Sequence, residues 1–142
     1  TQQGSDGLSP CQMPHGHRFI LKVYLNGEAV VDSKINGGMI ADFREVKKIL
    51  VSKIHDVYDH SFIIWKNDPA ASLFESMKTC KPYPDKIHVV SFVPTSENLV
   101  NVWFPILDAA FQEKNIILDS IELYETPNCS CTLLRKDYYE SI

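Results

Sequence analysis

Hydrophobic and polar residues alternate along the first part of the chain. Between positions 19 and 25 the apolar members of this alternation are Phe19, Leu21, Val23 and Leu25. A period of two places them on one face of a β-strand. Asn26-Gly27 follows and is typical of a tight hairpin turn, so residues 28–35 are expected to form the returning strand.

A helical period begins after the break at Asn36-Gly37-Gly38. Asp42 stands three residues before Glu45, which is the spacing of a helix N-cap and its capping-box partner. The hydrophobic residues that follow at helical spacing are Phe43, Val46, Leu50, Ile54 and Val57. The pattern therefore predicts an amphipathic helix over residues 43–58.

The second half of the chain predicts further helices and strands, with a less regular insert around residues 66–85. In chain order they are a short helix over 70–78, a strand over 86–93, a helix over 97–114, and strands over 116–125 and 131–139. Pro105 falls inside the longer helix and is expected to kink it. This order of elements indicates an α+β fold, in which an antiparallel β-sheet carries two helices on one face.

Length and charge narrow the class of protein. The chain has 142 residues and a formal net charge of −4, from 14 Lys and Arg against 18 Asp and Glu. The length fits a single domain over residues 1–142, and the mild acidity argues against nucleic-acid binding. No apolar run reaches the roughly 20 residues of a membrane-spanning helix, so no membrane partner is expected. The irregular spacing of the four cysteines favours reduced thiols and a cytoplasmic location.

Cys11 is followed closely by His15-Gly16-His17. Two histidines at i and i+2 of a strand project from the same face, so both imidazoles can reach one metal ion. Imidazole is a normal zinc ligand, and a catalytic zinc typically has three protein ligands and one open position. Taken alone, the same residues also fit surface histidines at a strand entry and a buried, unreactive Cys11.

Two further pairs of residues and one carboxylate are candidates for chemistry. Asp59 beside His60 can fix the tautomer of the imidazole and raise its basicity, although a helix end also favours a histidine. Glu125 ends a predicted strand. Its carboxylate can accept two parallel N–H bonds from the edge of a pterin or guanine. The alternative is a surface glutamate at the rim of the sheet. Thr95 and Ser96 precede the second long helix, where hydroxyls cap the helix or bind a ligand.

In this order, the motifs resemble the 6-pyruvoyl-tetrahydropterin synthase / 6-carboxy-tetrahydropterin synthase (QueD) family. They are Cys-x-x-x-His-Gly-His from Cys11, Gly-Met-Ile-Ala-Asp-Phe before the first helix, Asp59-His60, Pro94-Thr-Ser-Glu-Asn98 and Tyr124-Glu-Thr-Pro127. The resemblance covers residues 11 to about 135. The short gap between Cys11 and His15 looks closer to the bacterial carboxy-tetrahydropterin enzyme than to the animal pyruvoyl enzyme.

The resemblance implies a T-fold, in which subunits form a barrel as trimers that pair into hexamers. It also implies a zinc-dependent lyase acting on 7,8-dihydroneopterin triphosphate, with 6-carboxy-5,6,7,8-tetrahydropterin, triphosphate and acetaldehyde as products, in queuosine and 7-deazaguanine biosynthesis. By the same resemblance the Zn²⁺ ligands include His15 and His17. The catalytic residues would be Cys11, Asp59 and His60. The residues that bind the pterin would be Glu125, Thr95 and Ser96.

The chain departs from the family pattern at the metal site. The family takes its third zinc ligand from a histidine upstream of the cysteine, and none of the ten residues before Cys11 is a histidine. We expect a first strand outside this numbering to supply it, because a T-fold without that strand would expose a long sheet edge. Two alternatives stay open at this point: a 6-pyruvoyl-tetrahydropterin synthase, and a non-catalytic T-fold protein that binds a pterin or purine.

Overall fold

The computed structural model describes residues 13, 15–29, 37–81 and 84–142. Its main sheet is antiparallel and has the strand order β1-β4-β5, formed by β1 (Ile20–Asn26), β4 (Ile117–Thr126) and β5 (Cys129–Leu134). The predicted alternation in β1 is confirmed, because Leu21, Val23 and Leu25 pack against the core while their neighbours are exposed. The strand expected over 28–35 lies mostly outside the described residues.

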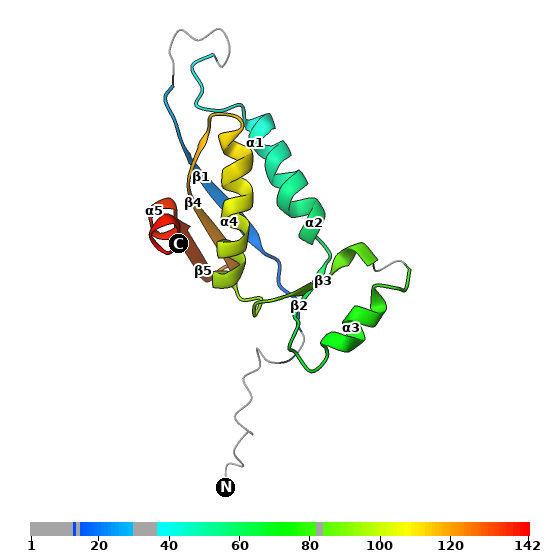
Figure 1. Ribbon diagram of the computed structural model, residues 1–142. Coiled ribbons are helices and arrows are strands. Elements are labelled where there is room, and N and C mark those ends of the chain that lie inside the picture. The colour runs from blue at the N-terminus through cyan, green and yellow to red at the C-terminus, as the bar shows by residue number, and fades with distance from the viewer. Residues whose placement is uncertain (1–12, 14, 30–36, 82–83) are drawn as a thin grey trace.

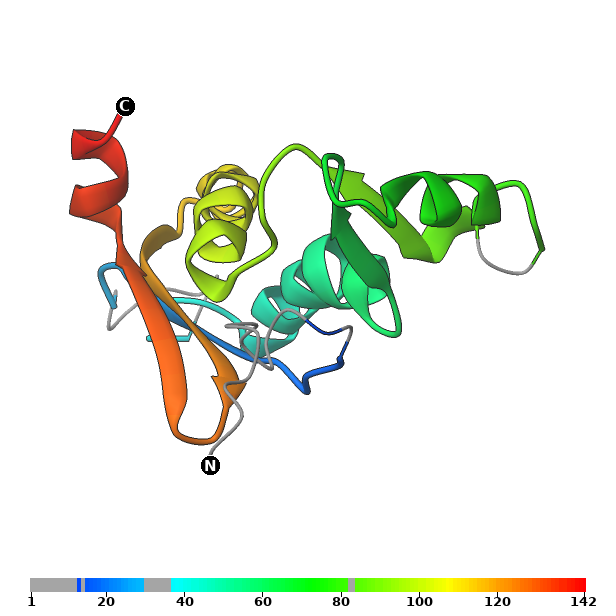
Figure 2. The same cartoon turned by 90° about the horizontal axis from the view of Figure 1, so that it is seen from below.

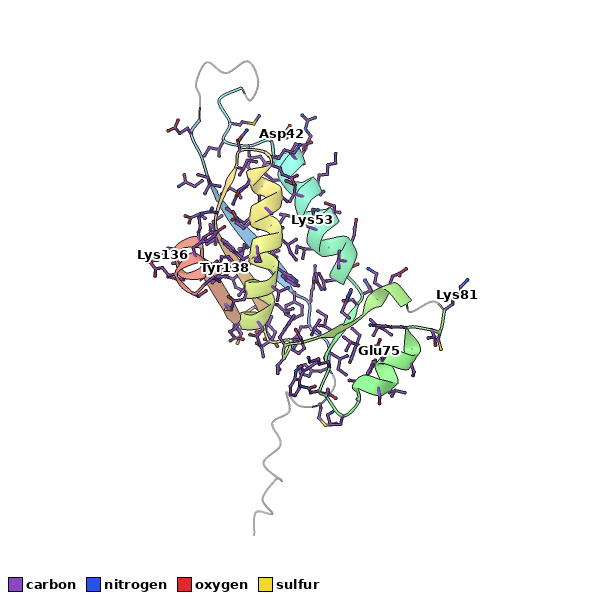
Figure 3. All side chains as sticks on the ribbon, in the orientation of Figure 1. Asp42, Lys53, Glu75, Lys81, Lys136 and Tyr138 are labelled. Atoms are coloured by element: carbon purple, nitrogen blue, oxygen red, sulfur yellow. The ribbon has the colours of Figure 1, made fainter. Side chains whose placement is uncertain are left out.

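Two helical segments cover one face of this sheet (Figures 1 and 2). The first is continuous over the predicted range, as α1 (Phe43–Leu50), a π-helical segment η2 (Val51–His55) and α2 (Asp56–Tyr58). Asp42, labelled in Figure 3, caps α1 by accepting a hydrogen bond of 2.8 Å from the Arg44 N–H. Its expected partner Glu45 instead forms an ion pair of 3.5 Å with Lys114.

The second segment, α4 (Ser96–Gln112), lies at the centre of the core. Its fully buried side chains pack between the sheet and the first helical segment, and the two largest are Phe104 and Phe111. Full burial of each such side chain contributes about 1.5–3 kcal/mol to stability. The helix continues through Pro105, and the expected kink there stays a prediction.

The middle of the chain forms a small unit beside the main sheet (Figure 1). Its elements are β2 (Phe62–Trp65), α3 (Ala71–Met77), the 3₁₀ turn η3 (Pro84–Lys86) and β3 (Ile87–Val90), with β2 and β3 paired in parallel. The predicted short helix is confirmed, and the strand predicted over 86–93 is shorter than expected. The sequence pattern does not predict β2, because its four consecutive apolar residues show no period that separates a strand from a helix.

The C-terminal segment differs from its prediction. Residues 131–139 were expected to form one strand, but β5 ends at Leu134 and the helix α5 (Arg135–Glu140) follows. The physical reason is the buried Asp108 of α4, which accepts hydrogen bonds from both Arg135 and Tyr139. Residues four apart reach one carboxylate from a helical turn, whereas a strand would separate them by more than 12 Å.

α5 therefore packs against α4 with one face and meets solvent with the other. The Tyr138 ring lies 4.9 Å from the Phe104 ring, while Lys136 is exposed on the far side of the helix (Figure 3). None of the helices in the described ranges combines the length and hydrophobicity needed to cross a bilayer.

Candidate metal centre

His15 and His17 lie close together in the segment that leads into the sheet. They precede Ile20, the first residue of β1, so the pair lies before the strand. The sequence pattern predicted the pair within the strand. Their ring centroids are 4.6 Å apart and the rings are nearly perpendicular, at 83°. The spacing of the two histidines thus brings both imidazoles to one place, as the sequence pattern indicated.

A backbone carbonyl fixes which nitrogen of His15 is available to a metal. The Nδ1 atom lies 2.6 Å from the carbonyl oxygen of Met13. Because a carbonyl only accepts hydrogen bonds, Nδ1 carries the hydrogen and Nε2 keeps its lone pair. Metal-binding histidines are usually oriented by such a contact at the other ring nitrogen.

Glu125 joins the two histidines because of an irregularity in the sheet. Tyr124 pairs with Ser130, but the next residue pair is Thr126 with Cys129, so Glu125 is the extra residue of a β-bulge. A bulge redirects a side chain at the end of a strand. Here Oε1 of Glu125 lies 2.8 Å from Nε2 of His17.

The N-terminus of α4 holds the second oxygen of Glu125. The hydroxyl of Ser96, which is only 6% exposed, donates a hydrogen bond of 3.0 Å to Oε2. The neighbouring Thr95 is the N-cap of α4 and accepts from the Asn98 N–H at 3.3 Å. The two adjacent hydroxyls therefore differ, since Ser96 orients the carboxylate whereas Thr95 completes the helix. A helix N-terminus also favours a negative charge beside it.

The donor set of this group fits a zinc ion. One donor atom each from His15, His17 and Glu125 can be chosen so that all lie within 4.8 Å of one another. Two imidazoles and one carboxylate form a known catalytic zinc set, whose ligand atoms are roughly 3.3 Å apart in a tetrahedral site. The group borders a cavity of about 420 Å³, lined in part by His17, Arg18, Glu125 and Thr126.

Asp59 and His60 pair with each other after the last turn of α2. Nδ1 of His60, a residue with the unusual φ of 52°, lies 2.8 Å from Oδ2 of Asp59. This hydrogen bond, aided by the charges of His60, His55 and Lys86, holds the pKa of the Asp59 carboxyl below its ordinary value. The pairing leaves Nε2 of His60 available to take up or release a proton.

This pair has one neighbour, His55, that was not among the predicted site residues. His55 lies one helical turn earlier, with Nε2 3.9 Å from Oδ2 of Asp59. Its i,i+4 spacing before Asp59 on a predicted helix was the signal that could have identified it.

Within the described residues, no hydrogen bond joins the Asp59–His60 pair to the group of His15, His17 and Glu125. Figure 1 shows the end of α2, the start of α4 and the β4–β5 hairpin at the same end of the molecule. Cys11 lies outside the described residues, so its predicted place beside these groups stays a prediction.

Comparison with known proteins identifies the family. A family model described as 6-pyruvoyl tetrahydropterin synthase matches residues 2–136. Two relatives are named 6-carboxy-5,6,7,8-tetrahydropterin synthase. The one from Rickettsia conorii is 33% identical over 124 residues, which cover 84% of this chain and 81% of the relative. The one from Haemophilus influenzae is 30% identical over 128 residues, which cover 90% of this chain and 85% of the relative.

A solved structure supports the same grouping. An uncharacterised protein from Wolinella succinogenes has a TM-score of 0.69 at 25% identity, and the match covers 92% of this chain and 83% of that chain. The antiparallel sheet with helices on one face agrees with the T-fold expected for the family. The chain therefore belongs to the 6-pyruvoyl tetrahydropterin synthase family.

Proposed function

We propose that this protein is a zinc-dependent 6-carboxy-5,6,7,8-tetrahydropterin synthase. Its substrate would be 7,8-dihydroneopterin triphosphate, which with one water gives 6-carboxytetrahydropterin, triphosphate and acetaldehyde, a step of queuosine and 7-deazaguanine biosynthesis. The names of the relatives support the reaction. The observation that supports a metal-assisted site is the convergence of His15, His17 and Glu125 beside a cavity.

The two histidines would hold the metal ion through nitrogen atoms. His15 offers Nε2, because its Nδ1–H is bound to the Met13 carbonyl, and His17 offers the nitrogen that now faces Glu125. When bound, zinc supplies a Lewis acid that polarises oxygen atoms of the substrate side chain and makes the adjacent C–H bonds more acidic.

Proton transfer is assigned to the remaining predicted catalytic residues. His60, held by Asp59 in the tautomer with the hydrogen on Nδ1, would take up or release a proton at Nε2. Cys11 would act as a thiolate base, the role implied by the family resemblance.

Substrate binding is assigned to the cavity beside the metal group. Glu125 lines this cavity and accepts a hydrogen bond from the buried Ser96 behind it, while the hydroxyl of Thr95 is committed to the helix cap. Arg18 lines the same cavity and offers a positive charge to an anionic substrate.

We extend the proposal to the state of the protein in the cell. It would be one T-fold domain over residues 1–142 that assembles into a trimeric or hexameric barrel in the cytoplasm. The edge position of β5 in the described sheet supports pairing with another subunit. The three cysteines in the described ranges, Cys80, Cys129 and Cys131, form no disulfide, which fits a reducing compartment.

The test is a product assay on the zinc-loaded protein with 7,8-dihydroneopterin triphosphate, followed by mass spectrometry. We expect 6-carboxytetrahydropterin and an equal amount of acetaldehyde. A product that keeps the whole side chain and releases no acetaldehyde would favour a 6-pyruvoyl-tetrahydropterin synthase, the second candidate, which the description of the matching family supports. No turnover with zinc bound would contradict both enzymes.

A further inference from the structure

We propose that Lys86 and His88 are positioning residues for Asp59 and His60, the proton-transfer pair. Both belong to the small unit formed by β2, α3, η3 and β3. The inference rests on the proposed function, in which this pair takes up or releases protons. It gives a task to the small unit, which the proposed function otherwise leaves unused.

The first support lies at the end of α2. This helix ends directly before the proton-transfer pair, so its last carbonyl groups need donors from outside the helix. Nζ of Lys86 donates a hydrogen bond of 2.7 Å to the carbonyl oxygen of Asp56. Nε2 of His88 lies 3.1 Å from the carbonyl oxygen of Val57 and carries the hydrogen, because a carbonyl only accepts. The two side chains therefore hold the backbone turn that leads into the pair.

The second support lies on the other side of the proton-transfer pair. β2 begins at Phe62, two residues after His60, and pairs in parallel with β3. In this register Ile63 lies opposite His88. Figure 1 shows β2 and β3 beside the end of α2. The pair thus lies in a short turn, and both ends of that turn are held by the same part of the small unit.

The backbone of His60 shows why the turn needs this support. Its φ of 52° lies in the left-handed region, which residues other than glycine rarely adopt. Such a conformation persists where the surrounding structure over-determines it. In this conformation Nδ1 of His60 lies 2.8 Å from Oδ2 of Asp59. Loss of the two outside donors lets the turn relax and weakens the hydrogen bond that fixes the His60 tautomer.

Aromatic packing ties the small unit to the core at the same place. The ring of His88 lies 5.1 Å from the ring of Tyr58, the last residue of α2. The Tyr58 ring in turn lies 5.0 Å from the ring of Trp103, which is buried in α4. His88 therefore contacts α2 through both its ring and its N–H, and its position is fixed relative to the core.

The test compares the kinetics of zinc-loaded variants that remove or keep each donor. Lys86→Met and His88→Phe keep a side chain of similar size without its N–H donor. Each should lower kcat about 10- to 100-fold and leave KM and zinc affinity unchanged. Lys86→Arg and His88→Gln keep an N–H donor and should restore most of kcat. Lys81→Met is the matched control, because Lys81 is exposed after α3, away from α2 (Figure 3), and its loss should leave kcat unchanged.

The tautomer of His60 gives a second readout that needs no substrate. In alkaline buffer, nitrogen NMR of the ring should show the hydrogen on Nδ1 in the parent and a mixture of both tautomers in Lys86→Met and His88→Phe. A parent-like tautomer in both variants would overturn the inference, as would a parent-like kcat in both. A parent that binds zinc without turnover would contradict the proposed function instead, and the tautomer then decides the inference alone.

Discussion

The adjacent residues Thr95 and Ser96 at the start of α4 make different hydrogen bonds. Thr95 closes the first turn of the helix through Asn98, whereas Ser96 turns its hydroxyl to Glu125. Both residues were predicted to bind the substrate, and the sequence alone left capping as the alternative. Which hydroxyl caps depends on where the helix begins: the pattern predicts a start at about residue 97, whereas the structure starts α4 at Ser96 and so makes Thr95 the N-cap.

Replacement of Thr95 should affect stability more than substrate binding. Thr95→Ala leaves one backbone N–H of the first turn without its acceptor and should lower the free energy of unfolding by about 1 kcal/mol. Thr95→Ser keeps an acceptor and should lose much less. Urea denaturation measures both. Unaltered stability in Thr95→Ala together with weaker substrate binding would favour the substrate role instead.

Asp59 should titrate at lower pH than an isolated carboxyl. The hydrogen bond from His60 keeps its pKa below the ordinary value of 3.8. Because the folded pKa is the lower one, the pairing stabilises the fold above the unfolded pKa, and this contribution is lost as pH falls through the folded pKa. Carboxyl-carbon NMR should place the midpoint below 3.8, and His60→Ala should move it upward. A midpoint at or above 3.8 in the parent would contradict the pairing.

At the scale of elements, local periodicity predicted the long helices well and the short or buried pieces poorly. The spacing of apolar residues after Asp42 was enough to predict the helix over 43–58, although the π-helical segment inside it has no local signal. The parallel strand β2 and the helix α5 were missed. In α5 the deciding partner, Asp108, is distant in sequence, so no pattern within residues 131–139 could reveal it.

Asp108 should be the main anchor of α5. Its carboxylate is buried and accepts hydrogen bonds from Arg135, Tyr139 and Gln112. The hydrogen bond to Asp108 raises the pKa of the Tyr139 phenol above its ordinary value. Arg135→Met leaves a buried carboxylate without its cation and should lower the free energy of unfolding by about 3–5 kcal/mol.

Two milder variants calibrate that measurement. Tyr139→Phe removes one hydrogen bond to a charged group and should cost about 1.5–3 kcal/mol. Lys136→Met, at the exposed neighbour of Arg135, should stay within about 0.5 kcal/mol of the parent. Equal effects of Arg135→Met and Lys136→Met in urea denaturation would show that Asp108 does not anchor the helix.

At the scale of the whole molecule, the candidate site exists only because distant segments meet. The antiparallel pairing of β1 with β4 brings the chain that precedes β1 to the end of β4, and α4 begins at the same place. The sequence predicted His15, His17, Ser96 and Glu125 one by one, from residue types and a family resemblance. It could not predict that Glu125 lies against His17, because a single-residue bulge redirects that side chain.

The proposed function requires that a metal ion held beside His15 and His17 drives conversion of the pterin. The most direct measurement follows 6-carboxytetrahydropterin formation from 7,8-dihydroneopterin triphosphate in the protein as isolated, after removal of metal with a chelator, and after addition of Zn²⁺. We expect turnover that chelation abolishes and zinc restores, and little turnover in His17→Ala under any condition. Undiminished product formation by the metal-free protein would contradict it.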